Sequence, residues 1–245
     1  MNRTIKRVLN GQDDNHMLPF FWLRGEDEAT LRKYMKAIYE ANCRAVCLES
    51  RPHPDFAGPK WWQDLDIILD EARRRDMKVW ILDDSHFPTG YANGFLEAPE
   101  RAHLRKKLVR ERVSDVVGPV PNAKLFPGGF LEKEIEEIVQ VVAYRHCDAA
   151  EGLDVSTAVD LTDKLQNGLV YWDIPEGVWR IFFYYKSRKG GRKEYIDMIN
   201  PDSVRVLIDA VYESHYAHYS KYFGNTFRGF FSDEPRIMHE AVLPA

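Results

Sequence analysis

Cysteine is scarce in this sequence: only Cys43, Cys47 and Cys147 occur among 245 residues. Their number is odd, and their spacing fits neither a zinc site nor a disulfide framework. No apolar run approaches the roughly 20 residues that a membrane span needs. The first residues carry positive charge, but no apolar stretch follows them, so they do not resemble a secretory signal. These absences predict a cytoplasmic protein with reduced thiols and no membrane partner.

An excess of charge of one sign is also missing. The 34 Lys and Arg residues are balanced by 38 Asp and Glu residues, which gives a formal net charge of −4. Nothing in this balance predicts nucleic-acid binding. Hydrophobic residues make up 44% and charged residues 29%, as in an ordinary globular protein. Aromatic residues, at 13%, suit the stacking of sugars, although large core side chains are the commoner explanation.

The first third of the chain alternates short apolar runs with segments of helical periodicity. Residues 17–23, 44–49 and 77–82 predict strands. Residues 26–42 and 60–76 predict the helices between them. Because strands joined by single helices form right-handed βαβ units, we expect a parallel sheet.

Between about residues 97 and 195 this alternation stops. Residues 98–113 carry apolar side chains at helical spacing and predict a helix. Residues 138–144 predict a strand, and residues 168–173 and 178–185 predict the two strands of a hairpin. We therefore expect an inserted subdomain over residues 97–195, with one helix and a small antiparallel sheet.

The α/β alternation resumes with a predicted helix from about residue 200 to 223 and a predicted strand over 227–232. The resulting fold class is α/β. Residues 1–96 and 196–245 together form the amino-terminal half of a (β/α)8 barrel of the TIM type. A doubly wound sheet would give the same count of elements, but no Gly-rich dinucleotide loop follows any predicted strand.

Polar or protonatable residues follow each of the four predicted strands. In a (β/α) barrel the functional side chains lie where the strands end. One polar strand end is common by chance, whereas four in phase indicate a site. The candidates are Trp22 at the end of the first strand, Glu49 and Arg51 at the end of the second, Asp83, Asp84, His86 and Tyr91 after the third, and Asp233 and Glu234 after the fourth.

The pair Asp233-Glu234 is the sharpest of these patterns. A carboxyl group that is partly desolvated in the mouth of a barrel can hold its proton near neutral pH. It can then protonate a glycosidic oxygen, provided that a second carboxylate lies across the sugar. The alternative is that both residues begin a solvated loop.

The remaining candidates also admit structural explanations. Asp83 and Asp84 are adjacent, so at most one of them faces a common centre, where it could bind sugar hydroxyls or a cation. A capped turn at the strand end explains them equally well. Glu49 and Arg51 either contact a sugar or form a purely structural ion pair. Substrate contact and ordinary packing are both open for the other three, Trp22, His86 and Tyr91.

Three blocks of the sequence, in the same order, resemble one group of enzymes. Residues 227–235 look like the fourth strand of barrel glycosidases, in which Asn-Glu-Pro carries the acid/base. Residues 79–94 are similar to the block Asp-Glu-x-x-x-Pro-Ser-Gly-x-Ala-Gly-Gly of the α-L-rhamnosidases of glycoside hydrolase family 106. Residues 169–181 resemble the β-insert of that family, and the whole resemblance covers residues 17–240.

The resemblance implies an O-glycosyl hydrolase with Glu234 as acid/base. It also implies calcium, although no complete ligand set can be placed here. Four positions depart from the family patterns: Asp84 stands in place of Glu, Thr89 of Ser, Asn93 of Gly, and Asp233 of the Asn that bonds a sugar 2-hydroxyl. Such enzymes continue through four further strands, one of which supplies the second carboxylate. We therefore expect the chain alone to be inactive or to self-associate through an open sheet edge.

Three functions stay open at this level. The first is a glycoside hydrolase acting on a carbohydrate substrate. The second is a carbohydrate-binding half-barrel that does not cleave its ligand. The third is a metal-dependent barrel hydrolase or isomerase, although the spacing of its candidate ligands fits no known pattern; they are His53, Asp83, His86 and Asp233.

Overall fold

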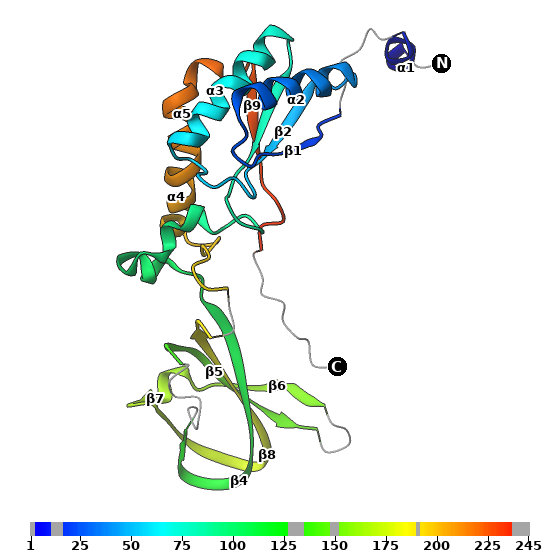
Figure 1. Cartoon of the computed structure of the whole chain (residues 1–245). Coiled ribbons are helices and arrows are strands. Elements are labelled where there is room, and N and C mark those ends of the chain that lie inside the picture. Colours follow the sequence, from blue (N-terminus) through cyan, green and yellow to red (C-terminus); the bar gives the residue numbers. More distant parts are fainter. Residues whose placement is uncertain (1–2, 11–16, 127–134, 148–151, 190–191, 237–245) are drawn as a thin grey trace. The chain divides into compact units, whose positions relative to one another are not determined.

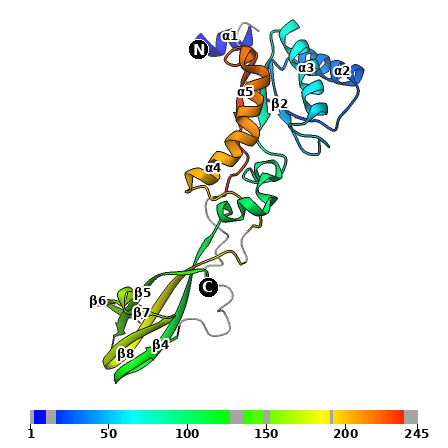
Figure 2. The same ribbon diagram turned by 90° about the vertical axis from the view of Figure 1, so that its left-hand side faces the viewer.

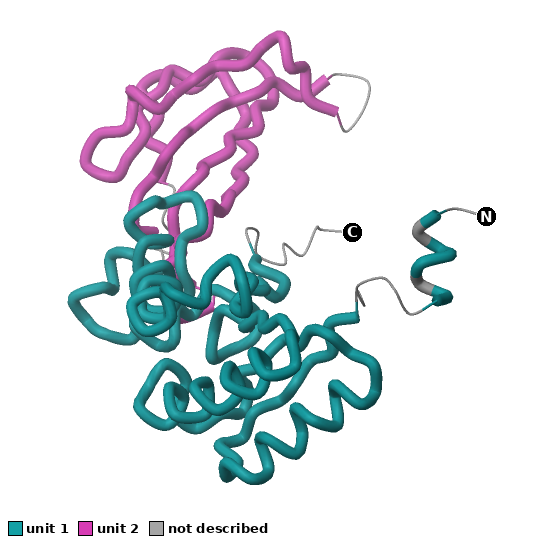
Figure 3. Tube along the Cα trace, turned by 90° about the horizontal axis from the view of Figure 1, so that it is seen from above, with its two compact units in different colours: residues 1–105, 194–245 teal, residues 106–193 magenta. Residues whose placement is uncertain are grey.

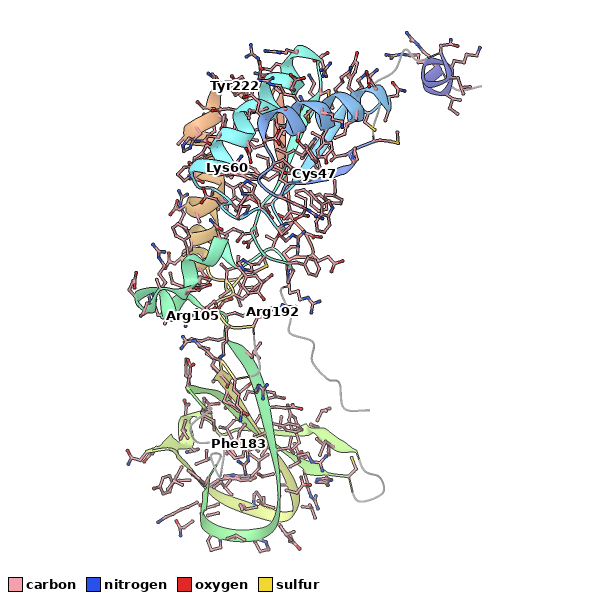
Figure 4. The ribbon with its side chains drawn as sticks, viewed as in Figure 1. Cys47, Lys60, Arg105, Phe183, Arg192 and Tyr222 are labelled. Carbon is pink, nitrogen blue, oxygen red and sulfur yellow. The ribbon has the colours of Figure 1, made fainter. Side chains whose placement is uncertain are left out.

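The computed structural model describes residues 3–10, 17–126, 135–147, 152–189 and 192–236. The chain forms two compact units, one made of residues 1–105 and 194–245 and the other of residues 106–193 (Figure 3). Figure 4 labels Cys47 in the sheet of the first unit and Phe183 in that of the second. None of the described helices has both the length and the apolar character that crossing a membrane requires.

The first unit contains a four-stranded parallel sheet in the order β1-β2-β3-β9 (Figure 1). Its strands are β1 (Phe20–Trp22), β2 (Ala45–Glu49), β3 (Lys78–Leu82) and β9 (Phe227–Phe231). The predicted parallel pairing in sequence order is confirmed. Within the described residues the sheet does not close on itself, so β1 and β9 are its edges and a complete barrel is not established.

Helices cover one face of this sheet (Figure 2). They are α2 (Glu28–Glu40), α3 (Pro59–Arg74), α4 (Pro201–Leu207), the π-helix η5 (Ile208–Glu213) and α5 (Ser214–Tyr219). Short 3₁₀ helices lie at Ala92–Glu97, Pro99–Leu104 and Ser220–Tyr222, and α1 spans Arg3–Leu9. The helix predicted over 200–223 is thus continuous along the chain, but a π-helical turn interrupts its α-helical pattern.

Local signals set where these helices begin. Asp27 caps α2 by accepting a hydrogen bond from the backbone N–H of Thr30 at 2.8 Å. Asn200 caps α4 by accepting from the backbone N–H of Asp202 at 3.1 Å. The apolar faces of the helices then pack on the strands in one core, which includes Leu31, Met35, Val46, Leu65, Val79 and Val211.

The opposite face of the sheet carries exposed aromatic side chains. Phe20 and Trp22 on β1 are 49% and 54% exposed, and Phe231 on β9 is 36% exposed. The rings of Phe20 and Phe231 meet edge to face, with their centroids 5.4 Å apart. In a flat sheet, strands three places apart lie about 14 Å from each other, so this contact indicates that the sheet curls.

The second unit is a five-stranded antiparallel sheet. Its strands are β4 (Leu108–Leu125), β5 (Glu137–His146), β6 (Leu153–Asp160), β7 (Leu165–Gln166) and β8 (Leu169–Ser187), with a 3₁₀ turn at Thr162–Lys164. The order is β4-β8-β5-β6, and β7 pairs with β8. One face holds a separate core that includes Val141, Ala143, Val170, Trp179, Ile181 and Phe183.

The helix predicted over residues 98–113 is wrong. Only Pro99–Leu104 is helical, as a 3₁₀ helix, and β4 begins at Leu108. Two residues that are four positions apart lie on the same face of a helix and also on the same face of a strand. The apolar spacing that ends at Val109 and Val113 therefore does not distinguish a helix from a strand. Pairing with β8 along most of β4 decides in favour of the strand.

The hairpin predicted from residues 168–173 and 178–185 is also wrong. Both segments belong to β8, and both pair with β4 rather than with each other. The register shifts where Gly118 meets the stretch around Pro175. A Cβ at Gly118 would lie 1.9 Å from the carbonyl oxygen of Pro175, so only glycine allows this close approach.

His215 on α5 is fully buried in the first unit. Its Nε2 accepts a hydrogen bond from Trp61 Nε1 at 2.9 Å, and its Nδ1 donates to the carbonyl oxygen of Val211 at 2.6 Å. Burial lowers the pKa of His215 to about 4. The native protein therefore keeps this imidazole neutral.

This imidazole predicts a loss of stability in mild acid. In the unfolded chain a histidine takes up its proton near pH 6.5, whereas the folded protein resists protonation down to about pH 4. The stabilisation is complete above pH 6.5 and should decrease by about 3 kcal/mol as the pH falls to 4. The free energy of unfolding in urea, measured at a series of pH values, should not show this decrease in His215→Gln. The exposed control His103→Gln should retain it, and a slope equal in all three proteins would contradict the assignment.

Candidate functional site

The carboxyl ends of β2 and β9 meet at an arginine. The guanidinium of Arg51 donates to Glu49 through Nε and Nη2, the latter at 2.7 Å to Oε2, and Nη2 also donates to Asp233 Oδ2 at 2.8 Å. Glu49 is 2% exposed, and the guanidinium lies 5.3 Å from the ring centre of Phe87. Hydrogen bonds to Glu49 and then to Asp233 raise the pKa of Arg51. One cation thus joins two carboxylates that are 184 residues apart in sequence.

Asp83, directly after β3, is fully buried. Its Oδ1 accepts from the hydroxyl of Thr89 at 2.6 Å, and its Oδ2 accepts from the hydroxyls of Tyr212, at 2.5 Å, and Ser232. Burial raises the pKa of Asp83, and the three hydroxyl donors oppose that effect. The carboxyl group ties β3 to the π-helix and to the end of β9.

Asp84 is also fully buried and acts on the backbone that follows it. Its Oδ2 accepts from the N–H groups of Gly90, Tyr91 and Ala92 at 2.6–2.9 Å. Its Oδ1 accepts from the N–H groups of residues 85 and 93 at 2.8 and 3.0 Å. One carboxylate thereby holds five backbone donors of residues 85–93, which run from the end of β3 into the 3₁₀ helix Ala92–Glu97.

This loop in turn holds the end of β9. The backbone N–H of Thr89 donates to the carbonyl oxygen of Asp233, and the N–H of Asp233 donates to Thr89 Oγ1, both at 2.9 Å. The hydroxyl of Tyr195 donates to the carbonyl oxygen of Thr89 and accepts from the N–H of Arg236. Hydrogen bonds therefore hold the backbone on both sides of Glu234, at Asp233 and at Arg236.

Glu234 projects from this segment as an exposed side chain on a backbone with φ of 44°. A positive φ is uncommon for a residue other than glycine and is often held in place by its surroundings at functional sites. The partial desolvation expected for a general acid is not supplied by the described residues. Substrate or further protein would have to provide it.

The other predicted site residues lie around this group. Trp22 is the register partner of Glu49 on the neighbouring strand. The rings of His86 and Tyr91 lie 5.4 Å apart, and His86 Nδ1 is 2.9 Å from the hydroxyl of Ser85. The structure thus brings Glu49, Arg51, Asp83 and Asp233 together where the strands have their carboxyl ends, and Asp84 accepts hydrogen bonds from the loop that follows β3. Their roles toward a substrate stay predictions.

Two contacts were not apparent from the sequence. Tyr212 lies within the predicted helix 200–223, and its hydroxyl bonds Asp83, which is 129 residues away in the sequence. Tyr195 lies at the end of the predicted insertion, yet its hydroxyl supports the loop at Thr89. Helical or strand periodicity does not report where the hydroxyl group of a tyrosine forms its hydrogen bond.

The residues of the metal hypothesis do not converge. His53 lies with Nε2 3.1 Å from Asp64 Oδ2, and both side chains are fully buried. Within the described ranges no three His, Cys, Asp or Glu side chains are arranged to hold a metal ion. Asp83 and Asp84 already accept three and five hydrogen bonds, so the described residues do not fit a calcium site.

Comparison with known proteins gives a fold but no family. No family model and no curated protein matches the sequence. A solved structure of a rhamnosidase from Novosphingobium sp. PP1Y is similar, with a TM-score of 0.57 and 10% sequence identity over 88% of this chain. The fold is distantly like that of a glycoside hydrolase. The chain spans 38% of the length of that rhamnosidase, so the activity of the larger protein is not carried over.

Proposed function

We propose that this chain is part of a glycoside hydrolase that cleaves O-glycosyl bonds of the α-L-rhamnoside type. The observation that carries the proposal is the meeting of Glu49, Arg51 and Asp233 at the carboxyl ends of the parallel strands. This edge is where barrel enzymes place their chemistry. The similarity to a rhamnosidase fold supports the same choice.

In this proposal Glu234 is the general acid. It protonates the glycosidic oxygen of the leaving group while the bond to the sugar breaks. Asp233 stays bound to Arg51 and thereby fixes the direction in which the next residue projects. Trp22, which is half exposed beside Glu49, stacks on the sugar. Tyr91 and His86, whose rings contact each other in the segment after β3, bind its hydroxyls.

The second carboxylate of the reaction comes from outside the described sheet. Glu49 and Asp233 are both bonded to Arg51, so neither is available as an independent nucleophile or base. Within the described residues the curled sheet has two open edges, at β1 and at β9. Further strands of the same protein, or a second copy, would complete the mouth of the barrel.

A carbohydrate-binding half-barrel without catalysis is the second candidate. The exposure of Glu234 favours it, because an exposed carboxyl group is not held in the desolvated state that suits an acid catalyst. Stacking on Trp22 and hydrogen bonds to Arg51 would still hold a sugar. The two candidates differ only in turnover.

The test combines association state with activity. We expect the 245-residue chain either to sediment as an oligomer or to be inactive on aryl α-L-rhamnosides, because its sheet edges are unpaired. A stable monomer that releases the phenol at enzymatic rates would contradict the inference that the site is incomplete in this chain. A form completed by four further strands that binds rhamnose without cleaving any aryl glycoside would favour the binding function.

A further inference from the structure

Strand β8 of the second unit carries large apolar side chains on both of its faces. Trp179, Ile181 and Phe183 point into the core of this unit. Phe182 and Tyr184 alternate with them and are half-buried on the opposite face. A sheet with one face in water needs apolar residues on one side only, so the outer aromatic residues require another explanation.

The outer rings form a compact group. The rings of Phe182 and Tyr184 are parallel within 7°, with centroids 6.2 Å apart. Tyr144 on β5 meets Phe182 edge to face at 6.0 Å. Val113 on β4, which is exposed, and Val142 on β5, which is buried, are the register partners that flank Phe182. These five residues are called the aromatic platform below.

The charges around the aromatic platform are mostly paired within the sheet. Arg180 donates to both carboxylate oxygens of Asp115, at 2.7 and 2.8 Å. Lys186 donates to Glu137 at 2.8 Å. Glu111 lies opposite Tyr184 in the register and adds one negative charge. These side chains offer hydrogen-bonding groups around the aromatic platform. Because their positive charges are paired with carboxylates, they attract an anionic polymer only weakly.

The polar edge of the aromatic platform can donate as well as accept hydrogen bonds. Burial raises the pKa of Tyr184, and the nearby Glu111 and Tyr144 add to the effect, so the hydroxyl keeps its proton. Gln140 lies opposite Tyr184 on the other neighbouring strand and contributes an amide. Sugar hydroxyls need this mixture of donors and acceptors beside an apolar surface.

We propose that the aromatic platform binds neutral pyranose rings of an oligosaccharide. The flat rings of Phe182 and Tyr184 stack on the apolar faces of the sugars, and Glu111 and Gln140 bond their hydroxyls. A stable protein interface takes roughly 20–30 residues a side, many more than the five of this group. A group of this size matches one or two sugar rings. The site uses none of the carboxylates proposed for hydrolysis.

The experiment is affinity electrophoresis of the full chain in gels that contain galactomannan, xyloglucan or mixed-linkage β-glucan, with polygalacturonate as an anionic gel. We expect at least one neutral polysaccharide to retard the protein. Tyr184→Ala and Phe182→Ala should each weaken this binding at least about tenfold, because each removes a stacking surface. Tyr184→Phe should retain most of it. The matched control is Tyr171→Ala, on the same strand but outside the aromatic platform.

Each other outcome separates the possibilities. Retardation by none of the neutral gels, by polygalacturonate alone, or equally for wild type and Tyr184→Ala would overturn the proposal. Glu234→Gln should leave retardation unchanged, because the aromatic platform lies in the second unit. If Glu234→Gln or Trp22→Ala abolishes retardation and Tyr184→Ala does not, the sugar is held by the first unit. That result would spare the proposed function and reject this site.

Discussion

Asp84→Ala is expected to destabilise the first unit by at least about 3 kcal/mol. The substitution removes the acceptor of five backbone N–H groups in a fully buried position. Each buried donor left without a partner costs about 1–3 kcal/mol, and water that enters the space recovers only part of this. No other single side chain described here holds so many backbone groups of the site.

Urea unfolding followed by tryptophan fluorescence measures this effect. The control is Asp76→Asn, because the carboxylate of Asp76 is 93% exposed beside Lys78 and asparagine tolerates the positive φ of 51° at this position; this change should cost less than about 1 kcal/mol. The transition of the second unit, which carries Trp172 and Trp179, should stay in place for both variants. Equal midpoints for Asp84→Ala and Asp76→Asn would show that the five hydrogen bonds add nothing to stability.

The parallel sheet could be predicted because its signals are local. Apolar runs end in polar residues at Glu49, Asp83 and Ser232, and single helices separate the first three strands. The order of the strands then follows from the preference for right-handed crossovers between neighbours. Closure into a barrel could not be predicted in the same way, since it depends on what pairs with β1 and β9.

The errors in the second unit have one physical origin. Val109 and Val113 are four residues apart, which fits a helix face and a strand face alike. The stretch Ile174-Pro-Glu-Gly177 has the composition of a turn, yet it lies within β8 at an irregularity of the ladder. In both places the pairing of β4 with β8 outweighs the local preference, and no local pattern reports such long-range pairing.

The aspartates after β3 show how far a site can be read from the sequence. Alternation along a strand predicts that Asp83 and Asp84 face different surroundings. The structure agrees: one accepts side-chain hydroxyls, and the other accepts backbone N–H groups. That both are fully buried depends on Tyr212 and on the loop up to Asn93, which come together only in the folded chain.

Glu234→Gln is expected to lower kcat by about a hundred- to ten-thousand-fold in a form with a complete barrel mouth. The amide keeps the shape of the side chain but has no proton to give to the leaving oxygen. Substrate affinity should change little. The loss should be smaller for aryl glycosides with acidic phenols, because such groups depart without protonation.

The comparison with Asp233→Asn makes the experiment decisive. That change keeps an acceptor for Arg51 while removing a charge, so the segment stays bonded through Thr89 and the loss of kcat should be milder. The measurement is kcat for two leaving groups of different acidity in both variants. If Glu234→Gln loses the same factor with both, or loses nothing, Glu234 is not the acid. Asp233, the other carboxylate of this segment, would then be the one to test, since releasing it from Arg51 would free it to act.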